Sequence, residues 1–190
     1  NDYDLIKFFF SQENEKMIND KILDDVDYIV PKDRILEYIN KVIDIPYADF
    51  IAYLKENPNT REINSSHITQ CSSFTACEAS LCEVLLSENN PGLEYAEIGI
   101  LLSSYVSSNT SGALRKYGEN QIKTAYQLGL AFEYYNHWYL SCLGYVYLDL
   151  DNEKRLNILA RTLLRDPLYA KLIVDITQQD IYLKDYMDFL

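Results

Sequence analysis

The chain has 190 residues, of which 48% are hydrophobic and 24% are charged, a composition typical of one globular domain or two small ones. Seventeen basic and 29 acidic side chains give a net charge of −12, which excludes a generic polyanion-binding surface, so any nucleic-acid contact must be local. No apolar run approaches the roughly 18 residues that a membrane span needs, which predicts a soluble protein without a membrane partner.

The cysteine content points to the cell interior. Four cysteines in a chain of this length, without a charged-then-apolar signal segment at its start, predict a reducing, cytoplasmic location rather than a disulfide framework. The chain begins at Asn1 rather than at Met, which is compatible with a piece of a longer protein.

Residues 1–60 predict a helical N-terminal subdomain. Apolar residues recur at helical spacing from Met17 to Val26, from Ile35 to Ile43 and from Phe50 to Leu54. Each segment follows a helix-start signal, and these signals are Ser11-Gln12-Glu13-Asn14, Pro31 and Pro46. The same 60 residues hold seven basic and 13 acidic side chains, so the acidity of the chain is concentrated here.

Residues 61–92 predict a polar loop followed by a connecting helix. Arg61 to Ser73 is rich in hydroxyl and amide side chains and has no period, and the helical pattern resumes at Phe74. Loops longer than about 12 residues inside compact domains are often functional. Arg61, Ser66 and His67 are therefore candidate donors to nucleic-acid phosphates, with a plain solvent-exposed connection as the alternative.

Three short helices and a hairpin are predicted next. The helices cover Leu93 to Val106, Ala113 to Tyr117 and Gln121 to Leu128, with Gly118-Glu119-Asn120 as the turn between the last two. Gly129 ends the third helix. From Leu130 to Leu140 apolar and polar residues alternate on both sides of Asn136, which predicts a β-hairpin. Helices starting near Ser141, Asp151 and Pro167 complete residues 93–190.

The order of three helices and a hairpin is that of a winged helix-turn-helix module, whose third helix can enter the major groove of DNA. The predicted fold class is therefore mainly α with a small β-hairpin, made of a helical N-terminal subdomain and this winged module. Ser111 to Gly129 carries a net charge of +2 within an acidic chain. Amides can pair with adenine, and basic side chains can reach guanine or phosphate. The candidate DNA-binding residues of the third helix and the wing are Arg115, Lys116, Asn120, Gln121, Lys123, Thr124, Gln127, Tyr135 and His137.

Four segments also carry a resemblance to a known family. They are Thr75-Ala-Cys-Glu-Ala79, Gly118-Glu-Asn-Gln-Ile-Lys-Thr-Ala-Tyr-Gln-Leu-Gly-Leu130, Tyr139-Leu-Ser-Cys-Leu-Gly144 and Arg165-Asp-Pro-Leu-Tyr169. The span from Thr75 to Leu172, about half the chain, resembles the winged-helix recognition subdomains of type IIS restriction endonucleases of the FokI class. The resemblance implies a DNA-recognition module that works with a nuclease domain or subunit. Ser141 stands where Thr is commoner in that family.

No catalytic motif of such a nuclease is present in the sequence. The usual centre has Asp or Glu two residues before a Lys, so that carboxylates hold Mg²⁺ while the Lys polarises the attacking water. None of the 11 Lys residues has a carboxylate at that spacing; Lys16, Lys21 and Lys154 have Asn there instead. We therefore expect no catalytic residue, no metal ligand and no cofactor in this chain, and Mg²⁺ only if a nuclease domain lies elsewhere.

Other reaction chemistry is also disfavoured. The spacing of His67, Cys71, Cys77 and Cys82 matches no paired zinc knuckle, so we interpret the cysteines as buried thiols. His137 and Cys142 are five residues apart on an extended segment, which separates their side chains.

Three functional hypotheses follow. The first is a duplex-DNA recognition module of a restriction or defence nuclease, acting without catalysis. The second is a protein-interaction winged helix whose acidic surface docks a basic partner. The third is a nuclease subunit with a divergent metal site.

Overall fold

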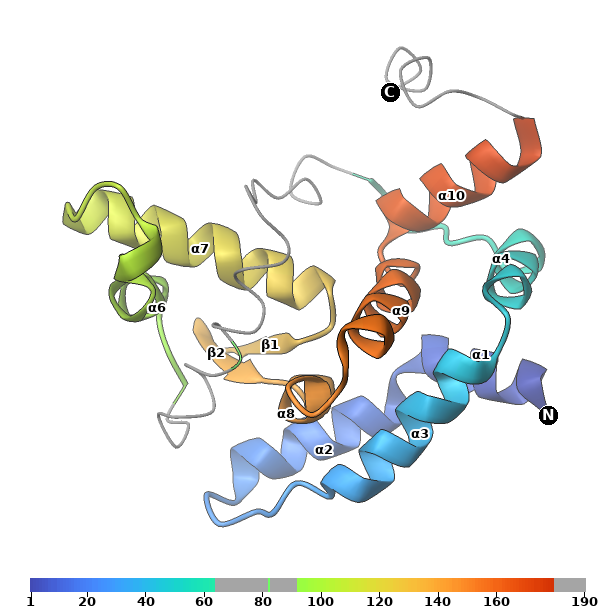
Figure 1. The fold of residues 1–190 in the computed structure, drawn as a ribbon, viewed down its shortest axis with the longest axis horizontal. Coiled ribbons are helices and arrows are strands. Elements are labelled where there is room, and N and C mark those ends of the chain that lie inside the picture. Colours follow the sequence, from blue (N-terminus) through green and yellow to red (C-terminus); the bar gives the residue numbers. More distant parts are fainter. Residues whose placement is uncertain (64–81, 83–91, 180–190) are drawn as a thin grey trace.

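The computed structural model describes residues 1–63, 82 and 92–179 (Figure 1). This part of the chain is mainly helical and contains one two-stranded antiparallel sheet, as the sequence predicts. No helix in it is both long and apolar enough to cross a bilayer. The predicted connecting helix from Phe74 and the C-terminal tail from Ile181 lie outside the described residues.

The N-terminal region is built of four helices: α1 (Asp2–Ser11), α2 (Glu13–Asp24), α3 (Lys32–Asp44) and α4 (Tyr47–Glu56). The last three confirm the predicted helices. Pro31 and Pro46 are the N-caps of α3 and α4, where the missing N–H of proline costs nothing. The expectation that Val26 lies on the apolar face of α2 is wrong, because the helix ends at Asp24 and Val26 is 94% exposed.

Helix α1 was not predicted from the sequence, because three consecutive phenylalanines give no helical period. It forms because Asn1 caps it and because Phe9 packs against Phe50 of α4, with ring centroids 5.5 Å apart. Phe10 stacks on Tyr53 at 5.1 Å. The helix thus depends on contacts with α4, more than 40 residues away in the sequence.

A helical pair follows, α6 (Tyr95–Leu101) and α7 (Ser111–Gln127), with a short 3₁₀ turn at Ser103–Tyr105. The predicted break at Gly118-Glu119-Asn120 is wrong, because α7 is continuous through it. Within residues 92–140 the hairpin is therefore preceded by two α-helices, where the sequence predicted three. Gly118 is buried against α6, and a Cβ atom there would overlap the backbone oxygen of Tyr95. A Cβ on Gly99 would overlap the backbone oxygen of Leu114. The glycine that suggested a turn instead allows two helices to touch backbone to backbone.

The predicted hairpin is confirmed as β1 (Ala131–Tyr134) and β2 (His137–Leu140), in antiparallel register. Gly129, at a φ of +76°, closes α7 as expected. Leu93 exchanges backbone hydrogen bonds with Trp138 of β2 and so extends the outer edge of the sheet. The Ser141 hydroxyl then accepts from the Gly144 N–H at 3.1 Å and caps α8 (Cys142–Tyr147).

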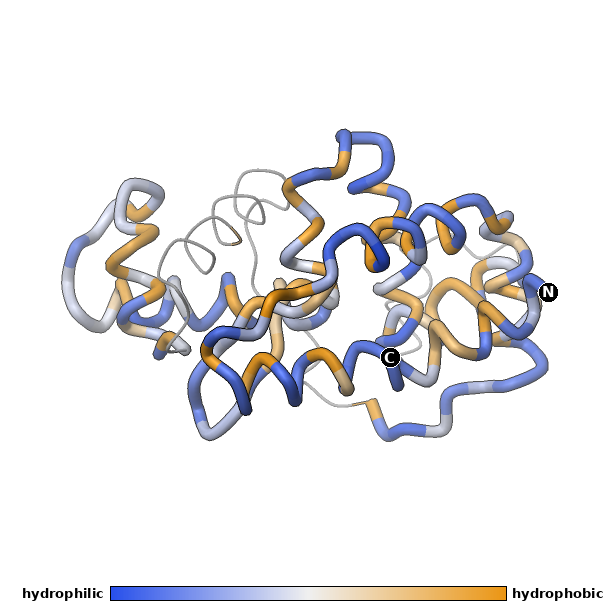
Figure 2. The backbone as a smooth tube through the Cα atoms, turned by 90° about the horizontal axis from the view of Figure 1, so that it is seen from below, coloured by the Kyte–Doolittle hydropathy of each residue, from blue (hydrophilic) through white to orange (hydrophobic). Residues whose placement is uncertain are grey.

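The C-terminal helices α9 (Asn152–Leu163) and α10 (Pro167–Gln179) begin where the sequence predicts them, and the Asp151 carboxylate caps α9. Leu156 of α9 is 65% exposed. Helices α8 and α9 contact α3, and α10 contacts α4, so the first and last parts of the chain share one hydrophobic core. Figure 2 shows hydrophobic and hydrophilic residues alternating along these helices. The predicted boundaries 1–60, 61–92 and 93–190 stay predictions.

Candidate nucleic-acid interface

Three basic residues of α7 lie beside the face that packs against α6, and two of them, Arg115 and Lys123, lie over the ring of Tyr95 at the start of α6. Thr110 accepts a hydrogen bond from the Ala113 N–H and caps the helix. The buried face of α7 is formed by Gly118, Gln121, Ile122, Thr124 and Ala125. The side chains of Arg115, Lys116 and Tyr126 are exposed, and that of Lys123 is 44% exposed. The packing against α6 therefore fixes which side of α7 faces solvent.

Glu119 lies between two of these basic side chains. Its carboxylate accepts from the Lys123 ammonium at 2.6 Å and from the Lys116 ammonium at 3.3 Å. The hydrogen bond from Lys123 holds the pKa of Glu119 below its usual value, and the same bond raises the pKa of Lys123. One carboxylate is thus shared by two of the three cations of α7.

An aromatic cluster ties α7 to the hairpin. The Trp138 ring lies 5.9 Å from the ring of Tyr95 and 5.9 Å from that of Tyr126. The guanidinium of Arg115 lies 5.6 Å from the centroid of Tyr95, on which Lys123 also rests at 5.9 Å. The sequence did not predict this cluster, because Tyr95, Tyr126 and Trp138 come from three different elements and show no local pattern.

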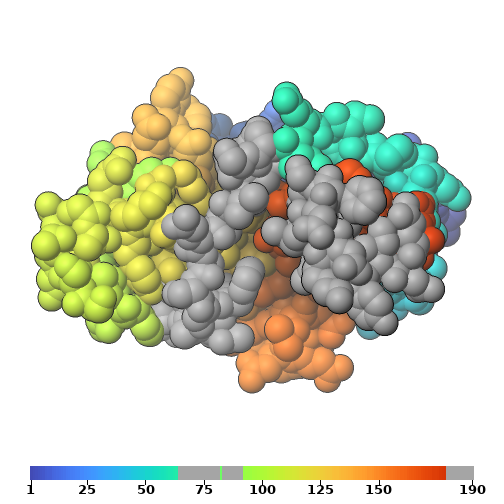
Figure 3. Space-filling model, turned by 90° about the horizontal axis from the view of Figure 1, so that it is seen from above, coloured from blue at the N-terminus to red at the C-terminus, as the bar shows by residue number. Residues whose placement is uncertain are grey.

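The hairpin projects from the molecule at the end that α7 also occupies (Figure 3). Its two-residue tip has Tyr135 at φ +48° and Asn136 at φ +64°, the geometry of a type I′ turn. Tyr135 is 79% exposed, and its ring meets that of Tyr134 edge-on at 4.5 Å. Glu133 accepts from the Asn136 N–H at 2.9 Å. A bulky aromatic residue thus occupies a left-handed position that usually favours Asn, Asp or Gly.

The remaining wing candidate, His137, is half-buried beside an acidic side chain. Its Nε2 lies 3.9 Å from the Glu94 carboxylate, and its Nδ1 lies 3.0 Å from the Tyr135 backbone oxygen. The wing therefore offers an aromatic and imidazole surface that is flanked by carboxylates.

Several predicted base-reading side chains do not face solvent. Gln121 is 4% exposed and Thr124 is 3% exposed, which corrects the expectation that both lie on the open face of the third helix. The physical reason is the unbroken helix, because joining the two predicted segments places Gln121 and Thr124 on its buried face together with Gly118, Ile122 and Ala125. Asn120 is half-buried, and the Gln127 amide donates to Asp166 at 3.4 Å.

Arg61 contacts a different part of the protein from the candidates on α7 and the hairpin. It lines a polar hollow with residues of α1, α4 and the end of α9, among them Ser11, Tyr53 and Leu164. Ser66 and His67 lie outside the described residues. The structure thus brings together Arg115, Lys116, Lys123, Tyr135 and His137, on α7 and the adjoining hairpin, and gives Arg61 different neighbours.

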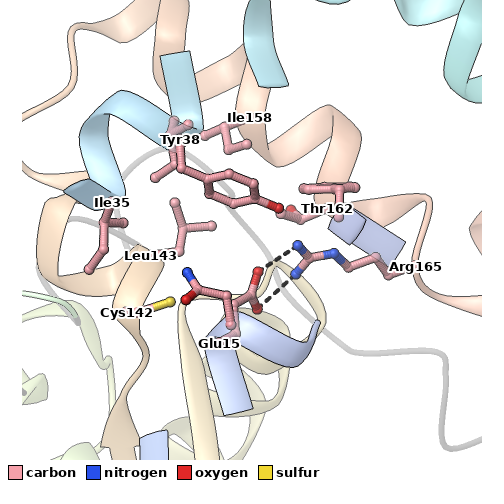
Figure 4. Close-up of a pocket in the computed structure, with 11 residues that line it drawn as sticks. Glu15, Ile35, Tyr38, Cys142, Leu143, Ile158, Thr162 and Arg165 are labelled. Atoms are coloured by element: carbon pink, nitrogen blue, oxygen red, sulfur yellow. Dashed lines mark hydrogen bonds and ion pairs between the residues drawn. The ribbon is translucent and has the colours of Figure 1, made fainter. Parts of the chain in front are cut away.

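A small cavity between the N-terminal and C-terminal helices holds the remaining polar cluster (Figure 4). The guanidinium of Arg165 makes a two-pronged pair with Glu15, at 2.5 and 2.9 Å. Burial raises the pKa of the Tyr38 hydroxyl and of the Cys142 thiol well above their usual values. Cys142 is therefore protonated at neutral pH and is no nucleophile, which agrees with its interpretation as a buried thiol.

Among residues 1–63, 82 and 92–179, no three His, Cys, Asp or Glu side chains lie close enough together to hold a metal ion. Comparison with protein-family models, with curated proteins and with solved structures finds no match to this chain. The basic and aromatic surface of α7 and the hairpin is thus defined by its own geometry alone.

Proposed function

We propose that α7 and the β1–β2 hairpin bind duplex DNA in the manner of a winged helix-turn-helix, as the recognition part of a restriction or defence nuclease. The observation that carries the proposal is that α7 holds Arg115, Lys116 and Lys123, the first two with exposed side chains, beside a projecting hairpin in a chain of net charge −12. A local basic surface on an acidic protein favours a specific anionic partner over general charge attraction.

The order of elements supports this assignment. Leu93 pairs with β2, and α6, α7, β1 and β2 follow it along the chain. In helix-turn-helix proteins the second helix of the pair enters the major groove, a role that falls here to α7. The resemblance of residues 75–172 to the recognition subdomains of type IIS endonucleases of the FokI class points the same way.

The exposed chemistry favours contacts to phosphates over contacts to bases. Arg115 and Lys116 lie in the first half of α7, free to reach the DNA backbone, whereas Gln121 and Thr124 are buried. Tyr135 and His137 would touch the backbone or the minor groove from the wing. We therefore expect a strong dependence of affinity on salt and a modest preference for sequence.

Binding is tested by fluorescence anisotropy with a labelled random-sequence duplex across a salt series. We expect Arg115→Ala and Lys116→Ala each to weaken binding and to lower the salt slope by about one unit. Glu119→Gln should tighten binding, because it removes the carboxylate that competes with phosphate for Lys116 and Lys123.

Lys41→Ala is the matched control, since Lys41 also pairs with a carboxylate one helical turn away, at 2.6 Å, but on α3. It should leave binding unchanged. Absence of binding at low salt, or an equal loss in the Lys41 and Lys116 variants, would refute the DNA interface.

Catalysis is placed outside this chain, in a nuclease domain or subunit. The chain has no Asp or Glu two residues before a Lys. Phosphodiester hydrolysis needs a metal ion and an activated water in line, and DNA binding supplies neither. With Mg²⁺ or Mn²⁺ the purified protein should leave supercoiled plasmid intact. Nicking abolished by one Asp or Glu substitution would instead favour a nuclease subunit with a divergent metal site.

A further inference from the structure

The loop between α2 and α3 exposes two aliphatic side chains almost completely. Val26 is 94% exposed and Ile29 is 87% exposed, the two highest values among the large hydrophobic side chains of the described residues. Figure 1 shows this loop at the ends of α2 and α3, where the chain reverses direction. Scattered exposed aliphatic residues are ordinary on protein surfaces, but here the two most exposed ones lie three positions apart in one loop, and we call residues 24–30 with these side chains the patch.

The backbone of the loop holds these side chains outward. The Asp25 carboxylate accepts from the Asp27 N–H at 3.0 Å, and the Asp25 carbonyl accepts from the Tyr28 N–H at 3.0 Å. Tyr28 is half-buried with the Lys21 ammonium 5.7 Å from its ring, and Val30 is buried in the core. Because the inward residues anchor the turn, the outward ones are presented in a fixed geometry, which reduces the entropic cost of binding a partner.

The patch is also locally acidic. Asp24, Asp25 and Asp27 surround Val26, and residues 22–31 contain no basic side chain. Asp24 and Asp25 lie at the C-terminal end of α2, where a carboxylate opposes the helix dipole and costs stability. Asp25 offsets part of this cost through its hydrogen bond, whereas Asp24 has no hydrogen bond or ion pair with any of the described residues.

We infer that this loop, residues 24–30, docks a basic segment of a partner protein that inserts at least one apolar side chain between Val26 and Ile29. The carboxylates would select Lys or Arg around that side chain. A second copy of this chain carries the same charge of −12, and an anionic membrane surface is also negative, so both are repelled by the patch. The inference does not depend on DNA binding by α7.

The test uses a library of random 12-residue peptides displayed on phage and selected on the full chain. Peptides that survive should carry an excess of Lys and Arg together with an apolar residue. Their affinities, measured with synthetic labelled peptides, should fall about tenfold or more in the Val26→Ser/Ile29→Ser double variant. Asp24→Asn/Asp27→Asn should weaken binding and reduce its salt dependence, while it leaves the free energy of unfolding unchanged or raises it.

Leu156→Ser is the matched control, because Leu156 is also an exposed aliphatic residue, at 65%, but lies on α9. It should not alter peptide binding. The inference is overturned if no peptide is enriched, if enriched peptides bind the double variant equally well, or if they lack excess positive charge. It is also overturned if Val26 and Ile29 instead mediate dimerisation in sedimentation experiments or binding to vesicles of phosphatidylcholine and phosphatidylserine.

Discussion

Helices α9 and α7 both carry basic side chains, but these side chains have different hydrogen-bond partners. Arg155 donates to the backbone oxygens of Tyr147 and Leu148, at the end of α8, at 3.0 and 2.8 Å. Arg161 donates to those of Ile43 and Ile45, at the end of α3, at 2.8 and 2.7 Å. Carbonyls at helix C-termini lack partners within their own helix, so both guanidiniums cap a neighbouring helix.

Among the described residues, the cations of α7 donate to no backbone carbonyl of another element. Lys116 and Lys123 pair with Glu119 on the same helix, and Arg115 rests on a tyrosine ring. A count of charges along the sequence treats the two sets as equal. Arg155 and Arg161 therefore join α9 to neighbouring helices, whereas Arg115 and Lys116 of α7 keep exposed side chains.

The largest expected effect is on Arg161. Arg161 is 4% exposed, and burial lowers the pKa of its guanidinium. The buried charge is stabilised by the backbone oxygens of Ile43 and Ile45, to which it donates. We expect Arg161→Met to reduce the free energy of unfolding by about 3 to 5 kcal/mol, because it leaves buried carbonyls without donors. Urea denaturation measures this change. Arg115→Met should alter the free energy of unfolding by less than about 0.5 kcal/mol. Equal losses in the two variants would show that the arginines of α7 and α9 contribute equally to stability.

The next prediction separates the buried and exposed sides of α7. Gly118→Ala should destabilise the protein by about 1 to 3 kcal/mol, because the added methyl overlaps α6 and forces the helices apart. Gly112→Ala, in the first turn of the same helix, meets nothing within 4 Å and should stabilise by about 0.5 to 1 kcal/mol. Thermal unfolding of the two variants should therefore shift in opposite directions; shifts of one sign would contradict the close α6–α7 contact.

A substitution of Tyr135 at the tip of the hairpin should have a smaller effect on the free energy of unfolding, and it also tests DNA binding. Tyr135→Asn should raise the free energy of unfolding by about 0.5 to 1 kcal/mol, because Asn tolerates the left-handed backbone better than Tyr does. The same change should weaken DNA binding if the ring contacts the duplex. Tyr134→Asn is the control, since Tyr134 lies in an extended strand and its loss should destabilise the hairpin. A destabilised Tyr135 variant would show that the ring serves packing instead.

The smallest prediction concerns the pairs around Glu119. Its pKa in the folded protein lies below the usual value of 4.5, so these pairs stabilise the fold above that pH and the contribution is lost as the pH falls through the folded-state pKa. For side chains this close to solvent we expect less than about 1 kcal/mol. The stability difference between the wild type and Glu119→Gln, measured by urea denaturation, should shrink from pH 6 to below pH 4. A difference that is independent of pH would show that the pairs contribute nothing.

Much of the local structure could be predicted from the sequence. The starts of α3, α4, α9 and α10 follow from their proline or aspartate signals, and the hairpin follows from its alternation around Asn136. These features depend on the conformational limits of the residues themselves, such as the fixed φ of proline, the side-chain oxygen of Asp151 as a cap, and the period of a strand.

What only the tertiary structure decided is which side of each element is covered. Gly118 weakens an isolated helix, yet α7 continues through it, and α6 occupies the space that a side chain at this position would fill. Gln121 and Thr124, which the sequence placed on the open face, are buried in the folded protein. The sequence likewise established that arginines are present near residues 155–165, but their use as caps required α3 and α8 to end beside them. Hydrogen-bond and packing partners far apart in the chain leave no local pattern, so their identity is determined only when the chain has folded.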